Sequence, residues 1–186
     1  MTSEEYMDLG RVVRRAGGKD LDRVVGLIAG AGLPVAGVAE GFEHFVVADA
    51  GGEVVGAAGI ELYGESALLR SVVVRPDWKG KRLGVALVSA ALERAREAGV
   101  REAYLLTTTA ERWFPRLGFE ITQRSEVPEA MRSSVEFTEA CPASAVVMRR
   151  EIVAASGGAD GIGERAEERA ASRDPARDEC PRALAD

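Results

Sequence analysis

The chain has 186 residues, 46% of them hydrophobic, which suits one domain with a single substantial core. Its formal net charge of −6 and its aromatic content of 5% argue against a nucleic-acid-binding protein, which needs a broad basic surface or base-stacking platforms. Cys141 and Cys180 are far apart and form no C-x-x-C pair, which favours a reducing compartment over a disulfide scaffold. Without a charged-then-apolar leader or an apolar run of about 20 residues, the sequence indicates a cytoplasmic protein that binds no membrane.

Strands and helices follow one another along most of the chain. Segments rich in β-branched and apolar residues predict strands, in chain order, at residues 11–16, 45–48, 53–63, 68–74, 102–107, just after Gly118–Phe119, and 144–153. Amphipathic segments predict helices from residue 20 to Gly30 or Gly32, at residues 34–43, 83–98 and 110–117, and in part of 128–140. Asp20 is placed to cap the first of these helices. This order of elements indicates a mixed α/β sheet.

Composition divides the chain into three parts. Residues 1–10 are polar and are expected to form a flexible N-terminus, and residues 11–153 carry the predicted strands and helices. From residue 154 onward large apolar side chains nearly vanish, so burial cannot offset the entropy of ordering this segment. We therefore expect one folded domain over residues 11–153 and a disordered tail over residues 154–186.

Residues 68–99 predict a strand–helix junction that binds an anion. A buried strand ends before Pro76, and a glycine-containing turn leads into a long helix. The first helical turn has N–H groups without intrahelical partners, the macrodipole adds partial positive charge, and Lys79, Lys81 and Arg82 add full charges. An ordinary strand–helix connection is the alternative reading. There is no G-x-x-x-x-G-K-[ST], and no G-x-G-x-x-G follows a strand, so two standard phosphate loops are excluded.

The same junction resembles the acetyl-CoA loop of the GNAT acetyltransferase superfamily, whose pattern is [QR]-x-x-G-x-[GA]. Residues 81–86 read Lys-Arg-Leu-Gly-Val-Ala, and a V-x-V-x-P precedes them at residues 72–76. Lys81 stands where the family has Gln or Arg, and Arg82 stands where many members carry glycine. Arg82 adopts unusual backbone angles less cheaply than glycine does, whereas a helical conformation there would suit it.

This resemblance implies a GNAT fold, with a mixed, mostly antiparallel central sheet of about seven strands, flanking helices and a splayed central strand pair. It implies acetyl-CoA as co-substrate and no metal. The loop backbone is expected to hold the diphosphate, while free backbone groups of the preceding strand pair with the pantetheine arm and stabilise the oxyanion. The expected cofactor-binding residues are Val72, Val73, Val74, Gly80, Lys81, Arg82, Leu83, Gly84 and Val85.

Acetyl transfer to an amine requires a base, because an ammonium has no lone pair with which to attack. His44 is the only histidine and has no nearby partner in the sequence, which favours a surface or core role. Glu61, on the strand before the central one, is the preferred base, and a solvated strand position is its alternative reading. Many GNAT members carry a tyrosine acid where this chain has Phe114, and a phenyl ring cannot donate a proton.

Residues 106–114 instead resemble the acetyltransferase domain of N-acetylglutamate synthases, in the form L-T-T-x-A-x-x-W-F. That resemblance implies hydroxyl or thiol side chains that assist near the thioester. Thr107 and Ser71 occupy the matching positions here. Because hydroxyls are poor acids at neutral pH, we expect both to hydrogen-bond the leaving sulfur or an ordered water.

A closer resemblance, over nearly all of the chain up to Val153, is to the arsenic-resistance N-acetyltransferase group (ArsN type) within GNAT. It is carried by residues 37–45, 63–64, 68–71, 104–111, 127–128, 136–137 and 141–145. It implies an amino-acid-like amine as acceptor, which includes an arsenic-containing amino acid. A substrate carboxylate needs a cationic partner, for which Arg70 and Arg132 are candidates, each with a surface ion pair as the alternative. Cys141 is a soft thiol, but one thiol is a poor metalloid site.

Three functions remain open at this point. The first is an acetyl-CoA-dependent N-acetyltransferase of a small amino-acid-like amine, linked to arsenic resistance. The second keeps this chemistry but takes glutamate or another ordinary amino acid as acceptor. The third is a non-catalytic acyl-CoA-binding or arsenic-sensing module, which the missing tyrosine favours. A small-molecule amine is the expected partner of the first two, and all three allow a homodimer.

Overall fold

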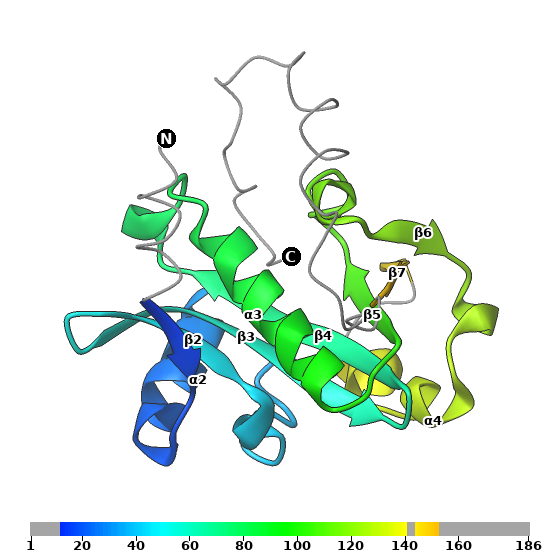
Figure 1. Cartoon of the computed structure of the whole chain (residues 1–186), viewed down its shortest axis with the longest axis horizontal. Helices are drawn as coiled ribbons and strands as arrows, with labels where there is room; N and C mark the ends of the chain where they lie inside the picture. The colour runs from blue at the N-terminus through cyan, green and yellow to red at the C-terminus, as the bar shows by residue number, and fades with distance from the viewer. Residues whose placement is uncertain (1–11, 141–143, 153–186) are drawn as a thin grey trace, which may run out of the picture.

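The computed structural model describes residues 12–140 and 144–152, which form one seven-stranded sheet in the order β1-β2-β3-β4-β5-β7-β6 (Figure 1). The strands are β1 Val13–Arg15, β2 Val46–Ala50, β3 Glu53–Tyr63, β4 Ser66–Val74, β5 Glu102–Thr107, β6 Glu120–Thr122 and β7 Val146–Glu151. The helical segments are η1 Gly18–Asp20, α2 Leu21–Gly30, η2 Phe42–His44, η3 Pro76–Trp78, α3 Leu83–Glu97, η4 Phe114–Leu117, η5 Arg124–Glu126, α4 Glu129–Arg132 and η6 Glu136–Ala140. The expected N-terminal segment 1–10, Cys141 and the tail 154–186 lie outside the described residues.

All seven predicted strands are confirmed, and turn chemistry sets their ends. β3 and β5 have the bounds that the sequence predicts. β2 runs through Ala50, two residues beyond its expected end, because the chain reverses at Gly51 and Gly52 alone. Both glycines have positive φ, 66° and 92°, which is the conformation of a two-residue hairpin turn and costs glycine little.

Two helical expectations and one cap are wrong. Residues 34–43 form turns followed by the short η2, because Gly37 has a φ of 76° and cannot belong to a right-handed helix. Of residues 110–117, only the 3₁₀ turn η4 is helical. Asp20 does occupy the N-cap position of α2, but its carboxylate accepts the Gly17 N–H (2.8 Å) and pairs with Arg14 instead of capping α2.

Helices cover both faces of the sheet. The longest, α3, lies along β3 and β4 in Figure 1, and its buried side chains form the main core with one face of the strands. On the opposite face, α2 and η2 form one apolar cluster and the α4–η6 segment forms another. Between these two clusters the central strand β4 presents Arg70. Among the helices described, none has the length and apolar content of a membrane crossing.

Candidate active site

The central strands β4 and β5 separate partway along their length. They run parallel and pair over Ser66–Leu68 and Glu102–Tyr104. Beyond these pairs β4 continues to Val74 beside β3, and the described residues show no further pairing with β5. The Arg75 N–H donates to the Val55 carbonyl on the β3 side (2.8 Å), and N–H groups alternate along a strand, so the Val74 N–H faces the β5 side. The expected splayed pair is therefore present, with backbone groups turned into the gap.

A β-bulge sits at the point where β4 leaves β5. Ser71 and Val72 together oppose the single residue Ala58, because the register with β3 shifts there. Ser71 has a φ of 53°, a left-handed conformation that is uncommon for a residue other than glycine. The bulge bends the second half of β4, so Val72, Val73 and the end of the strand follow a new direction along the gap.

The gap leads to the N-terminal tip of α3. A cavity of about 280 Å³ lies between the end of β4, the tip of α3 and the η4 turn that follows β5. It is lined by Val74, Trp78, Lys79, Gly80, Arg82, Leu83, Gly84, Val85, Trp113, Arg116 and Leu117. The first intrahelical bond of α3 runs from the Ala86 N–H to the Arg82 carbonyl, so the amides of the first turn have no partner within the helix. The tip is open and carries partial positive charge where Lys79 and Arg82 lie.

The loop before α3 adopts left-handed geometry at two residues. Gly80 has a φ of 78°, which glycine adopts without strain, and Arg82 has a φ of 56° at the N-cap. The helical conformation that would have suited Arg82 is therefore not the one adopted. Lys81 lies with its Nζ 4.4 Å from the centre of the Trp78 ring, a cation–π contact that anchors the exposed part of the loop.

Gly84 allows Trp113 to approach the first turn of α3. A Cβ built at Gly84 would lie 3.3 Å from the Trp113 indole, tighter than ordinary van der Waals contact. Trp113 in turn packs edge-to-face on Phe114, with ring centroids 4.9 Å apart, and Phe114 packs in the same way on Phe119 at 5.6 Å. Phe114, at the position where the GNAT resemblance implies an acid tyrosine, is therefore part of the core.

Glu61 and Arg70 meet on the face opposite α3. The Arg70 guanidinium pairs with Glu61 through Nη1 and with Glu136 through Nη2, the latter at 2.8 Å. It also donates to the Ala36 carbonyl at 2.6 Å and from Nε to the Ser71 hydroxyl at 3.3 Å. The candidate base and the candidate carboxylate receptor are thus partners of each other. Sequence reasoning missed Glu136, since nothing in the pattern places residue 136 beside β4.

Tyr63 is a second residue that sequence reasoning missed. Its hydroxyl donates to Glu61 at 2.7 Å, and burial together with this carboxylate raises the pKa of Tyr63 to about 12. Tyr63 and Glu61 are two residues apart on β3, and that spacing, which puts both side chains on one face, was the available signal. The buried Ser134 hydroxyl neighbours Tyr63 without meeting hydrogen-bond geometry, and it has no other partner in the described residues.

The remaining candidates occupy different positions. Thr107 is buried at the end of β5, and its Oγ1 accepts the Ala110 N–H at 2.9 Å, which fixes the turn toward Trp113. Arg132 is exposed on α4. His44 is half-buried beside Glu43 (3.5 Å) and joins no other candidate residue. Among the residues described, no group of three or more His, Cys, Asp or Glu side chains could hold a metal ion.

Known proteins resemble this chain over the same region. A family model of the acetyltransferase (GNAT) domain matches residues 41–121. An uncharacterised N-acetyltransferase of Chlorobaculum tepidum is 30% identical over 124 residues, which make up 64% of this chain and 79% of that protein. The amino-acid acetyltransferase of Pasteurella multocida is 24% identical over 96 residues, which are 50% of this chain and only 22% of that longer protein.

A solved structure shares the fold. N-acetylglutamate synthase from Neisseria gonorrhoeae, complexed with coenzyme A and N-acetyl-glutamate, superposes with a TM-score of 0.68 at 19% identity. The superposition covers 76% of this chain and 35% of that one. The region matched by the family model contains the splayed half of β4 and the open tip of α3. The chain belongs to the GNAT acetyltransferase family.

Proposed function

We propose that this protein transfers the acetyl group of acetyl-CoA to the amine of a small amino-acid-like substrate. The observation that carries the proposal is the gap between β4 and β5, which opens onto the cavity at the tip of α3. The diphosphate of the cofactor binds the first-turn amides of Leu83, Gly84 and Val85, with Lys79 and Arg82 adding charge. The pantetheine arm pairs with the backbone of residues 72–74 in the gap.

The reaction takes place beside the acceptor face, which is the face of the sheet opposite α3 that carries Glu61 and Arg70. The neutral amine nitrogen attacks the thioester carbonyl, and one of the β4 N–H groups of residues 72–74 stabilises the oxyanion that forms. The carbon–sulfur bond then breaks and coenzyme A leaves as the thiolate. Glu61 takes the amine proton, directly or through water, and the hydroxyls of Ser71 and Thr107 hydrogen-bond the leaving sulfur or that water.

The acceptor we propose is an amino acid or a close analogue. One relative is named amino-acid acetyltransferase, and a structural neighbour is complexed with coenzyme A and N-acetyl-glutamate. The resemblance of residues 37–45 and 68–71 to the ArsN-type group extends the proposal to arsenic-containing amino acids and to a role in arsenic resistance. An ordinary acceptor such as glutamate is the alternative, and a screen of arsenical, phosphinic and standard amino acids with thiol release as readout separates the two.

Substitution of Gly84 tests the cofactor site directly. Gly84→Glu introduces bulk against Trp113 and a negative charge at the anion-binding tip, so CoA affinity should fall more than about 100-fold by calorimetry. Gly26→Glu is a matched control, because Gly26 lies exposed in the middle of α2 with nothing within 4 Å of an added Cβ. Unchanged CoA affinity in folded Gly84→Glu would overturn the assignment of the loop. Full CoA binding without turnover across the screen would favour the non-catalytic alternative.

A further inference from the structure

Arg70 is a buried charged group on the acceptor face. Its side chain is 2% exposed, and Gly37 closes over it, since a Cβ at Gly37 would lie 2.9 Å from Arg70 Nη1. Gly37 also has a φ of 76°, so both the space and the backbone conformation at this position require glycine. The loop before η2 is therefore shaped to cover the guanidinium.

The donors of Arg70 are already committed within the protein. Nη1 serves Glu61, Nη2 serves both Glu136 and the Ala36 carbonyl, and Nε serves Ser71. A guanidinium has five N–H groups, so at most one is left for a ligand. A substrate carboxylate would have to displace Glu61 or Glu136 to form a bidentate pair with Arg70. Both glutamates belong to the same chain as Arg70, so the fold keeps them next to the guanidinium.

The same contacts join parts of the chain that are distant in sequence. Ala36 belongs to the loop after α2, Glu61 to β3, Ser71 to the β4 bulge and Glu136 to η6. Arg70 thus ties both apolar clusters of the acceptor face to the strand that leaves β5. A lysine in its place could keep one of these contacts but not the forked set, because an ammonium lacks the planar geometry.

The cluster is also unbalanced in charge. Two carboxylates face one guanidinium, which leaves one excess negative charge when both are ionised. Glu61 is its accessible member, with 20% of its side chain exposed against 9% for Glu136. The Tyr63 hydroxyl donates to Glu61 Oε2, the carboxylate oxygen that Arg70 does not bind, and so orients Glu61. The unpartnered Ser134 hydroxyl lies next to Tyr63. An ammonium group, with three donors and a positive charge, fits these acceptors, and a carboxylate does not.

We propose that Arg70 is a positioning residue that assembles the acceptor face, and that Glu61 and its neighbours receive the ammonium group of the acceptor, whose carboxylate Arg70 does not contact. This inference rests on the proposed function and specifies how that site selects its substrate. If a cation is needed for the acceptor's carboxylate, Arg132 on the exposed side of α4 is the candidate that remains.

Matched acids and amides test this assignment. The probes are L-glutamate, its γ-amide L-glutamine and its α-amide L-isoglutamine, each measured with acetyl-CoA in wild type, Arg70→Lys and Arg14→Lys. We expect Arg70→Lys to lower kcat/KM for all three by the same factor, roughly 10- to 100-fold, because it disturbs Glu61 and not carboxylate recognition. Arg14→Lys should leave all three within about twofold. A loss of tenfold or more in the preference for an acid over its amide, confined to Arg70→Lys, would overturn the inference.

Hydrogen exchange supplies a readout that does not depend on turnover. In Arg70→Lys, amides of residues 33–41 should exchange roughly tenfold faster, while α3 keeps its protection and its CoA affinity. Arg14→Lys should loosen residues 17–20 and leave 33–41 unchanged. Equal protection of residues 33–41 in wild type and Arg70→Lys would contradict the positioning role. Loss of CoA binding by the wild type would instead refute the proposed function, so the two failures are distinguishable.

Discussion

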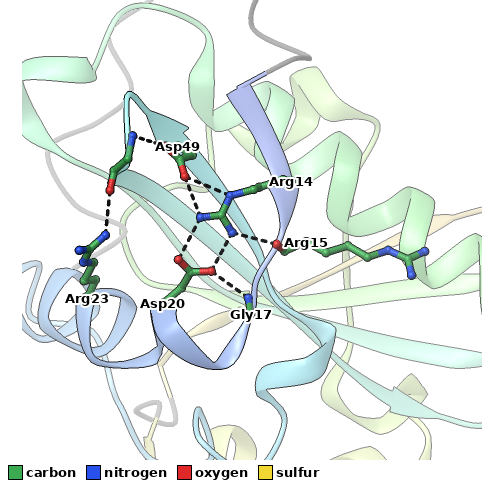
Figure 2. Close-up of polar contacts among 7 residues, drawn as sticks. Arg14, Arg15, Gly17, Asp20, Arg23 and Asp49 are labelled. Atoms are coloured by element: carbon green, nitrogen blue, oxygen red, sulfur yellow. Dashed lines mark hydrogen bonds and ion pairs between the residues drawn. The ribbon is translucent and has the colours of Figure 1, made fainter.

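Arg14 and Arg70 each bind two carboxylates, and of these two arginines only Arg70 lies at the candidate active site. Arg14 on β1 contacts Asp20 at 2.7 Å and Asp49 at 2.7 Å (Figure 2). Asp20 also accepts the Gly17 N–H, and Asp49 accepts the N–H of Gly52. Every carboxylate in Figure 2 thus holds a nearby turn of backbone in place, which is a structural task.

The Arg70 network has the same charges but a different location. Arg14 is 34% exposed on the edge strand, three strands away from β4, whereas Arg70 is buried where β4 separates from β5. Its partner Glu61 is partly exposed and accepts a hydrogen bond from the Tyr63 hydroxyl, whereas the carboxylates bound to Arg14 accept hydrogen bonds from backbone amides. We therefore assign the proposed chemical role to the cluster that lies beside the open strand, and the Arg14 cluster serves as an internal control.

Neutralising one carboxylate in each arginine network should give the largest difference in kcat. Glu61→Gln removes the proposed base, so kcat should fall about 100- to 1000-fold while CoA affinity stays unchanged. Asp49→Asn should change kcat by less than about twofold, since Asp49 is remote from the gap. Steady-state thiol release and CoA calorimetry measure both. Wild-type turnover in Glu61→Gln would place the base elsewhere and end the contrast.

Removing the hydroxyl groups next to the point where β4 and β5 separate should lower kcat less. Ser71→Ala and Thr107→Val should each lower kcat about tenfold with little change in CoA affinity, because one neutral hydrogen bond to the leaving group is lost. Thr107→Val also leaves the Ala110 N–H unpaired, so its Tm must be measured alongside. Ser133→Ala is the control, since that exposed hydroxyl bonds only the Ala130 carbonyl among the contacts described. Unchanged kcat in both variants would remove the proposed roles of Ser71 and Thr107.

Disrupting the Arg14 network should change how the stability of the fold depends on pH in acid, and it should not change catalysis. The hydrogen bond from Arg14, aided by the Gly17 N–H, lowers the pKa of Asp20 from 3.8 to about 2, although burial opposes the shift. A carboxyl with a lowered pKa stabilises the fold above its ordinary pKa and loses that contribution as the pH falls from about 4 toward 2. Arg14→Met should therefore lower Tm by about 3 °C at pH 7, and by less at pH 2.

Thermal unfolding followed across this pH range tests that expectation. An equal Tm difference between wild type and Arg14→Met at pH 7 and pH 2 would show that the ion pair is not its source. A catalytic defect in Arg14→Met at 25 °C, where the variant is folded, would break the distinction between the two networks.

Local sequence patterns predicted the elements that local interactions determine. The bounds of β3 and β5 and the start of α3 at Leu83 follow from hydrophobic period and glycine placement. The proposed anion-binding tip of α3 also follows from local sequence, because it consists of backbone amides that any helix start supplies. The turns over residues 34–43 were missed because the left-handed Gly37 packs against Arg70, and this contact is between residues distant in sequence.

The sequence by itself therefore determined the individual strands, the long helix and the helix start that we propose binds a diphosphate, since these depend on neighbours along the chain. Only the tertiary structure decided what the side chains on the other face do. Arg70 reads from sequence as a receptor for a carboxylate, and the fold supplies it with two carboxylates from β3 and η6. Ion pairing between residues 61, 70 and 136 depends on distances that strand register and the β4 bulge set, and no local pattern encodes those distances.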